Sequence, residues 1–174
     1  MPDPCIAAVC YRSGPTTKDI FKSFVQQMLD QGVDVQGLLQ ENLLNDDGSR
    51  WGVDAVDIKT NAHIPLMRPT QFELDNKRCS LDLSQLTEAT EVLRRALKSS
   101  AELCVVERFS KTESDGGGLA DDLMALMASG IPTVISVHED EHEAWLHYSG
   151  GLAEPVDGTL TALMAWWNRT QAPS

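Results

Sequence analysis

The residues with the clearest chemical potential directly follow an apolar run that ends at Val106. The segment 107–118 reads Glu-Arg-Phe-Ser-Lys-Thr-Glu-Ser-Asp-Gly-Gly-Gly. Acidic side chains at the end of a strand can hold Mg²⁺ or orient a water beside phosphates. Glycines ahead of a helix permit positive φ and a close approach of backbone N–H groups to a ligand. The catalytic candidates are Glu107, Lys111 and Glu113, and the binding candidates are Gly116, Gly117 and Gly118; the alternative is a solvated loop.

A second candidate segment lies between the first apolar run and the first amphipathic stretch. Residues 11–18 read Tyr-Arg-Ser-Gly-Pro-Thr-Thr-Lys. The phosphate-binding pattern G-x-x-x-x-G-K-[ST] would stand here, but Thr16 replaces its second glycine, Thr17 replaces its lysine, and Lys18 is displaced by one position. We predict a degenerate loop that still holds an anion, and an ordinary turn is the alternative. The binding candidates here are Arg12, Ser13, Gly14, Thr16, Thr17 and Lys18.

Three further patterns are candidate sites. Cys79 could ligate a soft metal with Asp82 nearby, or the pair could be loop packing and a helix cap. The run from His138 to His142 matches H-E-x-x-H, but the β-branched run before it predicts a strand, which separates the two histidines. We favour solvated histidines there; a zinc protease and a looser metal site that uses His138 and His142 are the alternatives, and the metal is left open. Trp166-Trp167 indicate packing or a dimer face.

These residues must be positioned by the elements around them. The expected strands span residues 5–11, 33–40, 102–106 and 131–137, and the expected helices span 16–31, 82–99, 119–129, 139–148 and 159–168. Residues 51–67 alternate apolar and polar side chains around a turn at 60–61, which predicts a hairpin with one solvated face. We expect a three-layer α/β domain with a mostly parallel sheet, whose ligands bind outside the carboxyl ends of the strands.

Composition narrows the class of protein. The 174 residues fit one domain, 1–174, and carry 14 Lys and Arg against 26 Asp and Glu, a net charge of −12. This balance opposes nucleic-acid binding and docking on anionic lipid. No apolar run is long enough to span a membrane, and the start does not resemble a signal peptide. The four cysteines include no C-x-x-C, which favours a cytoplasmic chain with reduced thiols; Cys5, Cys10 and Cys104 are expected in the core.

Two motifs of this sequence resemble those of a bacterial domain family of unknown function (domain of unknown function 2478). Cys79-Ser-Leu-Asp82 matches its C-x-L-D pattern, and residues 111–119 match K-x-E-x-x-G-G-G-L. A later Gly-Gly segment, Tyr148 to Gly151, also matches. That family is related to the thermophile-type nucleoside triphosphatases. Over nearly the whole chain, the resemblance implies a P-loop NTPase type of fold with an inserted β-hairpin and a loose link to molybdate transport.

The favoured function is binding of a small anion, either a nucleotide phosphate or a metal oxyanion such as molybdate. One alternative is a Mg²⁺-dependent nucleoside triphosphatase, in which Lys111 replaces the missing loop lysine as a point charge. The other is a non-catalytic regulatory or interaction protein. We expect Mg²⁺ as the cofactor if a nucleotide binds, a small anionic ligand as partner, and neither nucleic acid nor membrane; a homodimer is left open.

Overall fold

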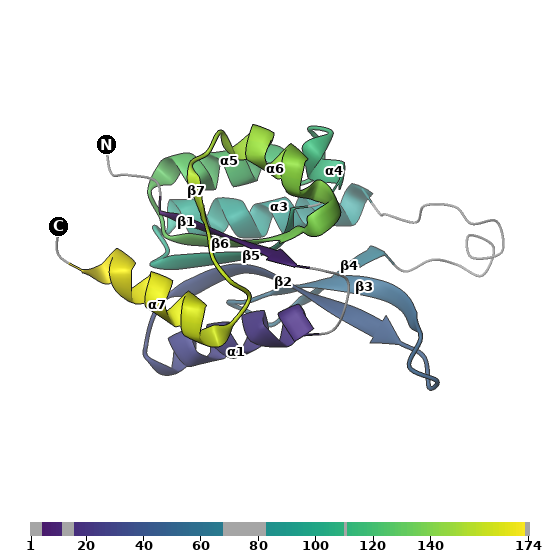
Figure 1. The fold of residues 1–174 in the computed structure, drawn as a ribbon. Coiled ribbons are helices and arrows are strands. Elements are labelled where there is room, and N and C mark those ends of the chain that lie inside the picture. Colours follow the sequence, from purple (N-terminus) through teal and green to yellow (C-terminus); the bar gives the residue numbers. More distant parts are fainter. Residues whose placement is uncertain (1–4, 12–15, 68–82, 110, 173–174) are drawn as a thin grey trace.

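The computed structural model describes residues 5–11, 16–67, 83–109 and 111–172, and shows an α/β arrangement (Figure 1). The strands are β1 (Ile6–Tyr11), β2 (Val35–Leu44), β3 (Arg50–Asp57), β4 (His63–Met67), β5 (Leu103–Phe109), β6 (Thr133–His138) and β7 (Ala153–Pro155). The helices are α1 (Thr16–Asp30), α3 (Leu83–Lys98), α4 (Lys111–Ser114), α5 (Ala120–Ser129), α6 (His142–Ser149) and α7 (Leu160–Gln171), with a 3₁₀ turn η1 (Glu139–Glu141).

Within these ranges one sheet has the order β4-β3-β2-β5-β6-β1-β7. Strands β2, β5, β6, β1 and β7 run parallel, as the alternation of apolar runs and helices predicts. The remaining strands form an antiparallel meander, since β3 pairs with β2 and β4 pairs with β3. The expected hairpin is confirmed as β3 and β4. A third strand joins it, because β2 continues to Leu44 and pairs with β3. The carboxyl ends of the parallel strands therefore meet at one edge of the sheet.

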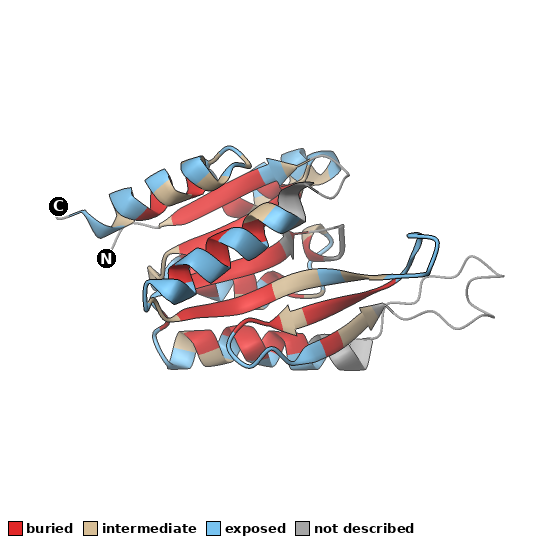
Figure 2. Ribbon diagram, turned by 90° about the horizontal axis from the view of Figure 1, so that it is seen from below, coloured by how far each residue is buried: buried red, intermediate tan, exposed pale blue. Residues whose placement is uncertain are grey.

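Helices cover both faces of the sheet and give three layers (Figure 1). On one face, α1 and α7 bury Phe21, Phe24, Met28, Leu163, Trp166 and Trp167 against the sheet. On the other, α3, α5 and α6 bury Leu93, Leu123, Leu126 and Trp145. Buried residues accordingly line the sheet and the inner helix faces (Figure 2). Trp166 and Trp167 thus serve packing, which answers one of the alternatives that the sequence left open.

The meander lacks the fully solvated face that its alternation predicts, because Asp54 and Asp57 are buried, 1% and 4% exposed. Asp57 faces α3, where its carboxylate accepts hydrogen bonds from Arg95 Nη2 at 2.7 and 2.8 Å. The Thr60 hydroxyl and the Lys59 N–H also donate to it. Burial alone would raise the pKa of Asp57, but these hydrogen bonds outweigh burial and lower the pKa.

Strands β2 and β5 approach closely at Gly37, which has φ of +124°. A Cβ added there would lie 2.0 Å from the carbonyl oxygen of Val105, so a larger residue cannot fit without moving one strand. Gly37 therefore lets the meander pair with the central strand β5.

Several sequence expectations need correction. The helix expected over 139–148 is a 3₁₀ turn followed by α6, and the short edge strand β7 and helix α4 were not predicted. Cys10 is exposed and Cys5 is half-buried rather than in the core, although Cys104 is buried as expected. Burial raises the pKa of the Cys104 thiol to about 12. Among the described residues, no helix is both long and apolar enough to cross a membrane.

Candidate functional site

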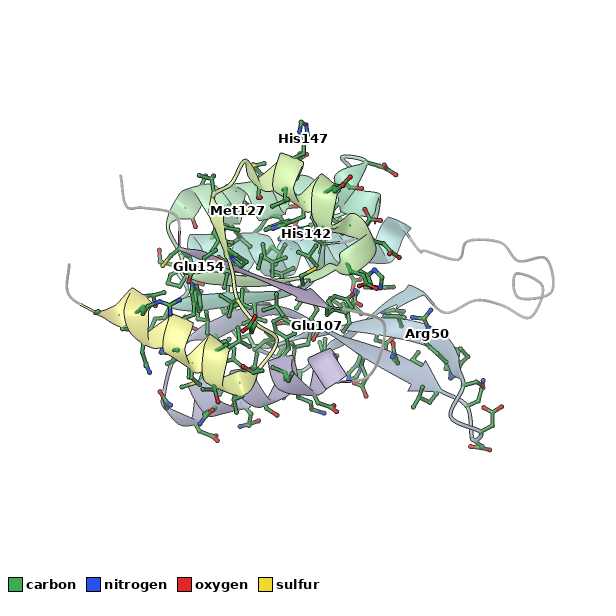
Figure 3. The ribbon with its side chains drawn as sticks, viewed as in Figure 1. Arg50, Glu107, Met127, His142, His147 and Glu154 are labelled. Atoms are coloured by element: carbon green, nitrogen blue, oxygen red, sulfur yellow. The ribbon has the colours of Figure 1, made fainter. Side chains whose placement is uncertain are left out.

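Glu107 stands at an irregularity near the carboxyl end of the central strand β5. Val106 pairs with Ile135, whereas Phe109 pairs with Val137, so β5 contains one extra residue between these pairs. This bulge keeps Phe109 on the same face as Val106, in the core beneath α5 and α6. Glu107 instead belongs to the α1 face, where it is only 6% exposed (Figure 3). A carboxylate is thereby held under α1 at the edge where ligands bind in parallel sheets.

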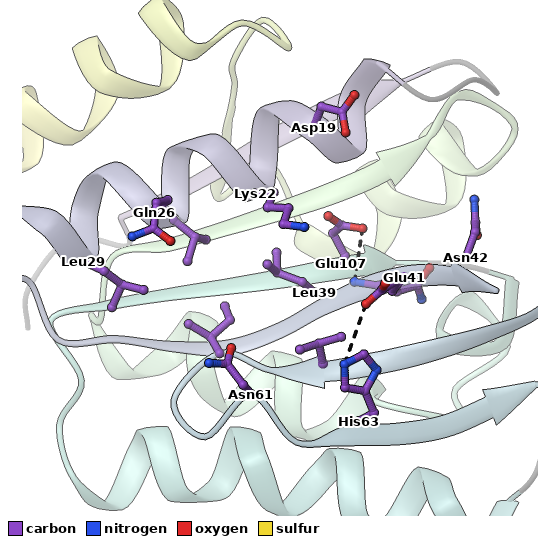
Figure 4. Close-up of a pocket in the computed structure, with 14 residues that line it drawn as sticks. Asp19, Lys22, Gln26, Leu29, Leu39, Glu41, Asn42, Asn61, His63 and Glu107 are labelled. Carbon is purple, nitrogen blue, oxygen red and sulfur yellow. Dashed lines mark hydrogen bonds and ion pairs between the residues drawn. The ribbon is translucent and has the colours of Figure 1, made fainter. Parts of the chain in front are cut away.

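A cleft of about 500 Å³ separates α1 from the meander and includes Glu107 (Figure 4). From α1 its lining includes Asp19, Lys22, Val25, Gln26 and Leu29. From the sheet it includes Leu39, Glu41, Val56 and His63, and from the turn between β3 and β4 it includes Ile58 and Asn61. Sites for small organic ligands commonly have volumes of roughly 300–1,000 Å³ with mostly apolar walls and a few polar groups. The cleft therefore has the size and composition of a small-molecule site.

The charges of this lining are mostly negative. Asp19, Glu41 and Glu107 are carboxylates, set against the ammonium of Lys22, so two net negative charges remain when His63 is neutral. Lys22 extends toward Glu107 (Figure 4), and the Gln40 N–H donates to Glu107 Oε2 at 3.4 Å. The described lining therefore favours a ligand that is neutral, cationic, or an anion accompanied by a metal cation.

The register of the meander places a histidine in the cleft. His63 pairs with Val56 across β3 and β4, so both side chains lie on the cleft face. The His63 Nδ1 atom lies 3.2 Å from Asp54 Oδ2, and its Nε2 atom lies 3.8 Å from Glu41 Oε2. Sequence reasoning missed these residues; the expected turn at 60–61 was the one signal that could have placed His63 opposite the acidic β3.

The glycine-rich segment lies on the opposite face of the sheet. Glu113 in α4 is 5% exposed and is not among the residues that line the cleft. Gly116 and Gly118 have positive φ values of 88° and 59°, the backbone conformation that glycine permits. The structure therefore separates Glu107 from Glu113 instead of joining them in one cluster.

An aromatic cluster anchors this segment. Phe109 contacts Trp145 and Tyr148 at ring-centroid distances of 5.1 and 5.0 Å. The Tyr148 hydroxyl donates to the carbonyl of Ala120 at the start of α5. Burial, followed by the nearby charges of Asp121 and Glu113, raises the pKa of Tyr148 to about 12, so the hydroxyl stays protonated. These contacts tie β5, α5 and α6 together around the loop.

Several candidate residues fall outside the described part of the chain. These are Arg12, Ser13, Gly14, Cys79 and Asp82. The side chains of Thr16, Thr17, Lys18 and Lys111 are likewise outside it, although the backbone places the first three in the first turn of α1 and Lys111 at the start of α4. Their roles remain predictions.

The two histidines of the H-E-x-x-H match lie on different elements, as the sequence indicated. His138 ends β6, where its Nδ1 accepts from the Asp140 N–H at 3.1 Å and its ring contacts Tyr11 at 5.3 Å. His142 is the first residue of α6. In the described ranges, no group of three or more His, Cys, Asp or Glu side chains is arranged to hold a metal ion.

The sheet order and the helices on both faces define an α/β domain of the P-loop NTPase type. A search of solved structures agrees: the chain matches a human cancer-related nucleoside triphosphatase with a TM-score of 0.58 and 21% identity, over 95% of this chain and 84% of that one. At this identity the likeness concerns the fold. Residues 6–166 match the model of the family described as "Protein of unknown function (DUF2478)", and the chain belongs to that family.

A curated relative gives a further similarity. The chain is 29% identical over 167 residues to "Molybdenum import ATP-binding protein ModC 2" of Bradyrhizobium diazoefficiens. The match covers 96% of this chain but only 18% of that relative's length. The ATP-binding and import functions that this name states are those of the relative, which is a much longer protein.

Proposed function

We propose that this domain binds a nucleoside phosphate at the carboxyl edge of its sheet. The phosphates would lie beside the first turn of α1, and the remainder of the ligand would enter the adjoining cleft. The observation that carries the proposal is Glu107: a buried carboxylate at the bulged end of β5, opening into a cleft under α1. The P-loop NTPase type of fold and the similarity to an ATP-binding import protein support the same ligand class.

The charge of the cleft favours a nucleotide that arrives with Mg²⁺. Mg²⁺ is commonly bound through one or two carboxylates together with substrate phosphates and waters, and Glu107 provides one such carboxylate. When bound there, the cation would neutralise phosphate charge. Lys22 reaches toward the same position and would contribute a second positive charge (Figure 4).

A metal oxyanion is the less favoured ligand. Molybdate carries two negative charges on a compact group, and without a cation it would meet the two net negative charges of the described lining. The name of the curated relative nevertheless makes molybdate a necessary arm of the test.

Calorimetric titration tests the proposal directly. ADP and ATP, each with and without Mg²⁺, would be compared with phosphate, molybdate and tungstate. We expect heat from the Mg²⁺-nucleotides, and at least tenfold weaker binding in Glu107→Gln. The matched control is Glu102→Gln, an exposed glutamate just before β5, at the far edge of the sheet. Absence of heat with every nucleotide would refute the proposal, and unchanged binding in Glu107→Gln would refute the role of that carboxylate.

Hydrolysis of the nucleotide is a second candidate activity, favoured by the same carboxylate. A buried acidic side chain at a strand end, pointing into the cleft, can orient an attacking water beside the terminal phosphate. We expect Mg²⁺-dependent phosphate release that is lost in Glu107→Gln and kept in Glu102→Gln. Loss in Lys111→Ala as well would assign that lysine the phosphate contact predicted from the sequence. Release no faster than in protein-free buffer would leave binding alone.

A further inference from the structure

The cleft extends well beyond the carboxylate at its phosphate end. Asp19, Lys22, Gln26 and Leu29 follow one another along a single face of α1. At a rise of about 1.5 Å per residue, these positions span roughly 15 Å. This is longer than a phosphate group needs, and Figure 4 shows the lining continuing from Glu107 toward Asn61 and Leu29.

The cleft also has apolar lining. Leu29 of α1, which is 41% exposed, lines it together with Leu39 and Val56 of the sheet. Apolar walls on two sides with a few polar groups at the rim are what a flat organic ring requires. Gln26 and Asn61 supply amide groups at this rim.

The polar edge of the cleft presents two acceptors side by side. In the tautomer whose Nδ1–H donates to Asp54, the His63 ring presents Nε2 as a hydrogen-bond acceptor. The carboxylate of Glu41 is the second acceptor, and its Oε2 lies 3.8 Å from Nε2. Because Asp54 is buried, it fixes the orientation of the imidazole ring. Adjacent acceptors complement a ligand edge that carries adjacent N–H donors.

On the basis of the proposed nucleoside-phosphate function, we propose that this cleft is a nucleobase site selective for a guanine-type edge. The ring N–H and the exocyclic amino group of guanine are neighbouring donors, which Nε2 of His63 and the carboxylate of Glu41 would accept. Adenine places an acceptor beside its amino group and would leave one of these acceptors facing another. A site built on such hydrogen bonds rejects analogues that lack the matching donor.

Nucleosides without phosphate test this site separately from the phosphate end. Guanosine, inosine, adenosine and cytidine would be titrated by calorimetry and by ligand-observed NMR. We expect guanosine to bind at least tenfold more tightly than inosine, which lacks the exocyclic amino group, and more tightly still than adenosine or cytidine. Equal affinity for all four, or no binding of guanosine, would overturn the proposal.

Two variants identify the groups involved. His63→Phe keeps a ring but removes the acceptor, and Glu41→Ala removes the carboxylate; each should reduce the preference for guanosine over adenosine at least tenfold. The controls are His147→Phe and Glu143→Ala, both exposed on α6 across the sheet. An imidazole ¹⁵N shift of His63, and not of His147, on adding guanosine provides a readout that a change in stability would not produce. Preference unchanged in both cleft variants would refute the assignment.

The outcomes separate this proposal from the proposed function. Guanosine binding that GMP and Mg²⁺-GDP do not improve would refute the phosphate site and support the base site. Nucleotide binding that depends on Glu107 but is equal for all bases would support the phosphate site and refute the base site.

Discussion

Replacing Asp57 by Asn removes the buried charge that joins the meander to α3. Breaking a fully buried ion pair costs roughly 3–5 kcal/mol because the remaining charge is stranded. Here the Arg95 side chain is 39% exposed and can be partly solvated, and Asn keeps one acceptor for its neighbours. We therefore expect a loss of about 2 kcal/mol in the free energy of unfolding at pH 7. For a chain of this size that corresponds to a fall in Tm of about 4–8 °C.

The pH dependence gives this prediction a second test. The pKa of Asp57 is lowered in the folded state, so its contribution is present above the unfolded-state pKa of about 3.9 and is lost as pH falls through the lower folded-state value. The difference between wild type and Asp57→Asn should therefore be full at pH 7 and shrink at pH 3. Urea denaturation followed by tryptophan fluorescence measures both.

Asp46→Asn, in the exposed turn between β2 and β3, is the matched control and should change stability by less than about 0.5 kcal/mol. A loss in Asp57→Asn as small as in this control would refute the reasoning. An equally large loss at both pH values would show that the variant acts through packing and not through the charge.

Three further predictions concern packing and thiol chemistry. Gly37→Ala should destabilise the chain by about 3 kcal/mol or more in urea titrations, because the added Cβ would clash with the β5 backbone and the residue has a positive φ. Gly48→Ala, in an open turn with positive φ but no such contact, should cost about 1 kcal/mol. Phe109→Ala should cost about 3–5 kcal/mol in the same assay and reduce the near-ultraviolet dichroism of the aromatic cluster; an unchanged spectrum would contradict this. Peptide mapping after thiol labelling at pH 8 should find Cys10 modified and Cys104 protected until denaturant is added. Cys104 is protected because it is buried and its pKa is about 12. Equal labelling of both cysteines in the native protein would be inconsistent with this burial.

Much of the architecture could be predicted from local sequence. Continuous apolar runs indicate strands that are buried on both faces, and the stripe from Ile20 to Met28 indicates a helix that packs on a sheet. Glu107 could be selected because a carboxylate directly after such a run must lie at the carboxyl edge of the sheet. The boundaries were less certain, since β2 extends to Leu44 by pairing with β3, a partner that periodicity does not identify.

The cleft itself could not be predicted in this way. Leu29 adjoins the apolar stripe of α1, yet its side chain lines the cleft and is 41% exposed, whereas the neighbouring Met28 is fully buried. Asp54 and Asp57 lie on opposite faces of one strand, as alternation predicts, but alternation does not identify their partners, which are His63 in the cleft and Arg95 of α3.

Sequence by itself determined which residues form strands and helices, because those preferences depend on neighbours within a few positions. Tertiary structure decided that Lys22, Glu41, His63 and Glu107 share one cleft. These residues come from α1, β2, β4 and β5, and they meet only through the order of strands in the sheet and the register of the meander. Strand order and register follow from packing across the whole sheet, which no local pattern encodes.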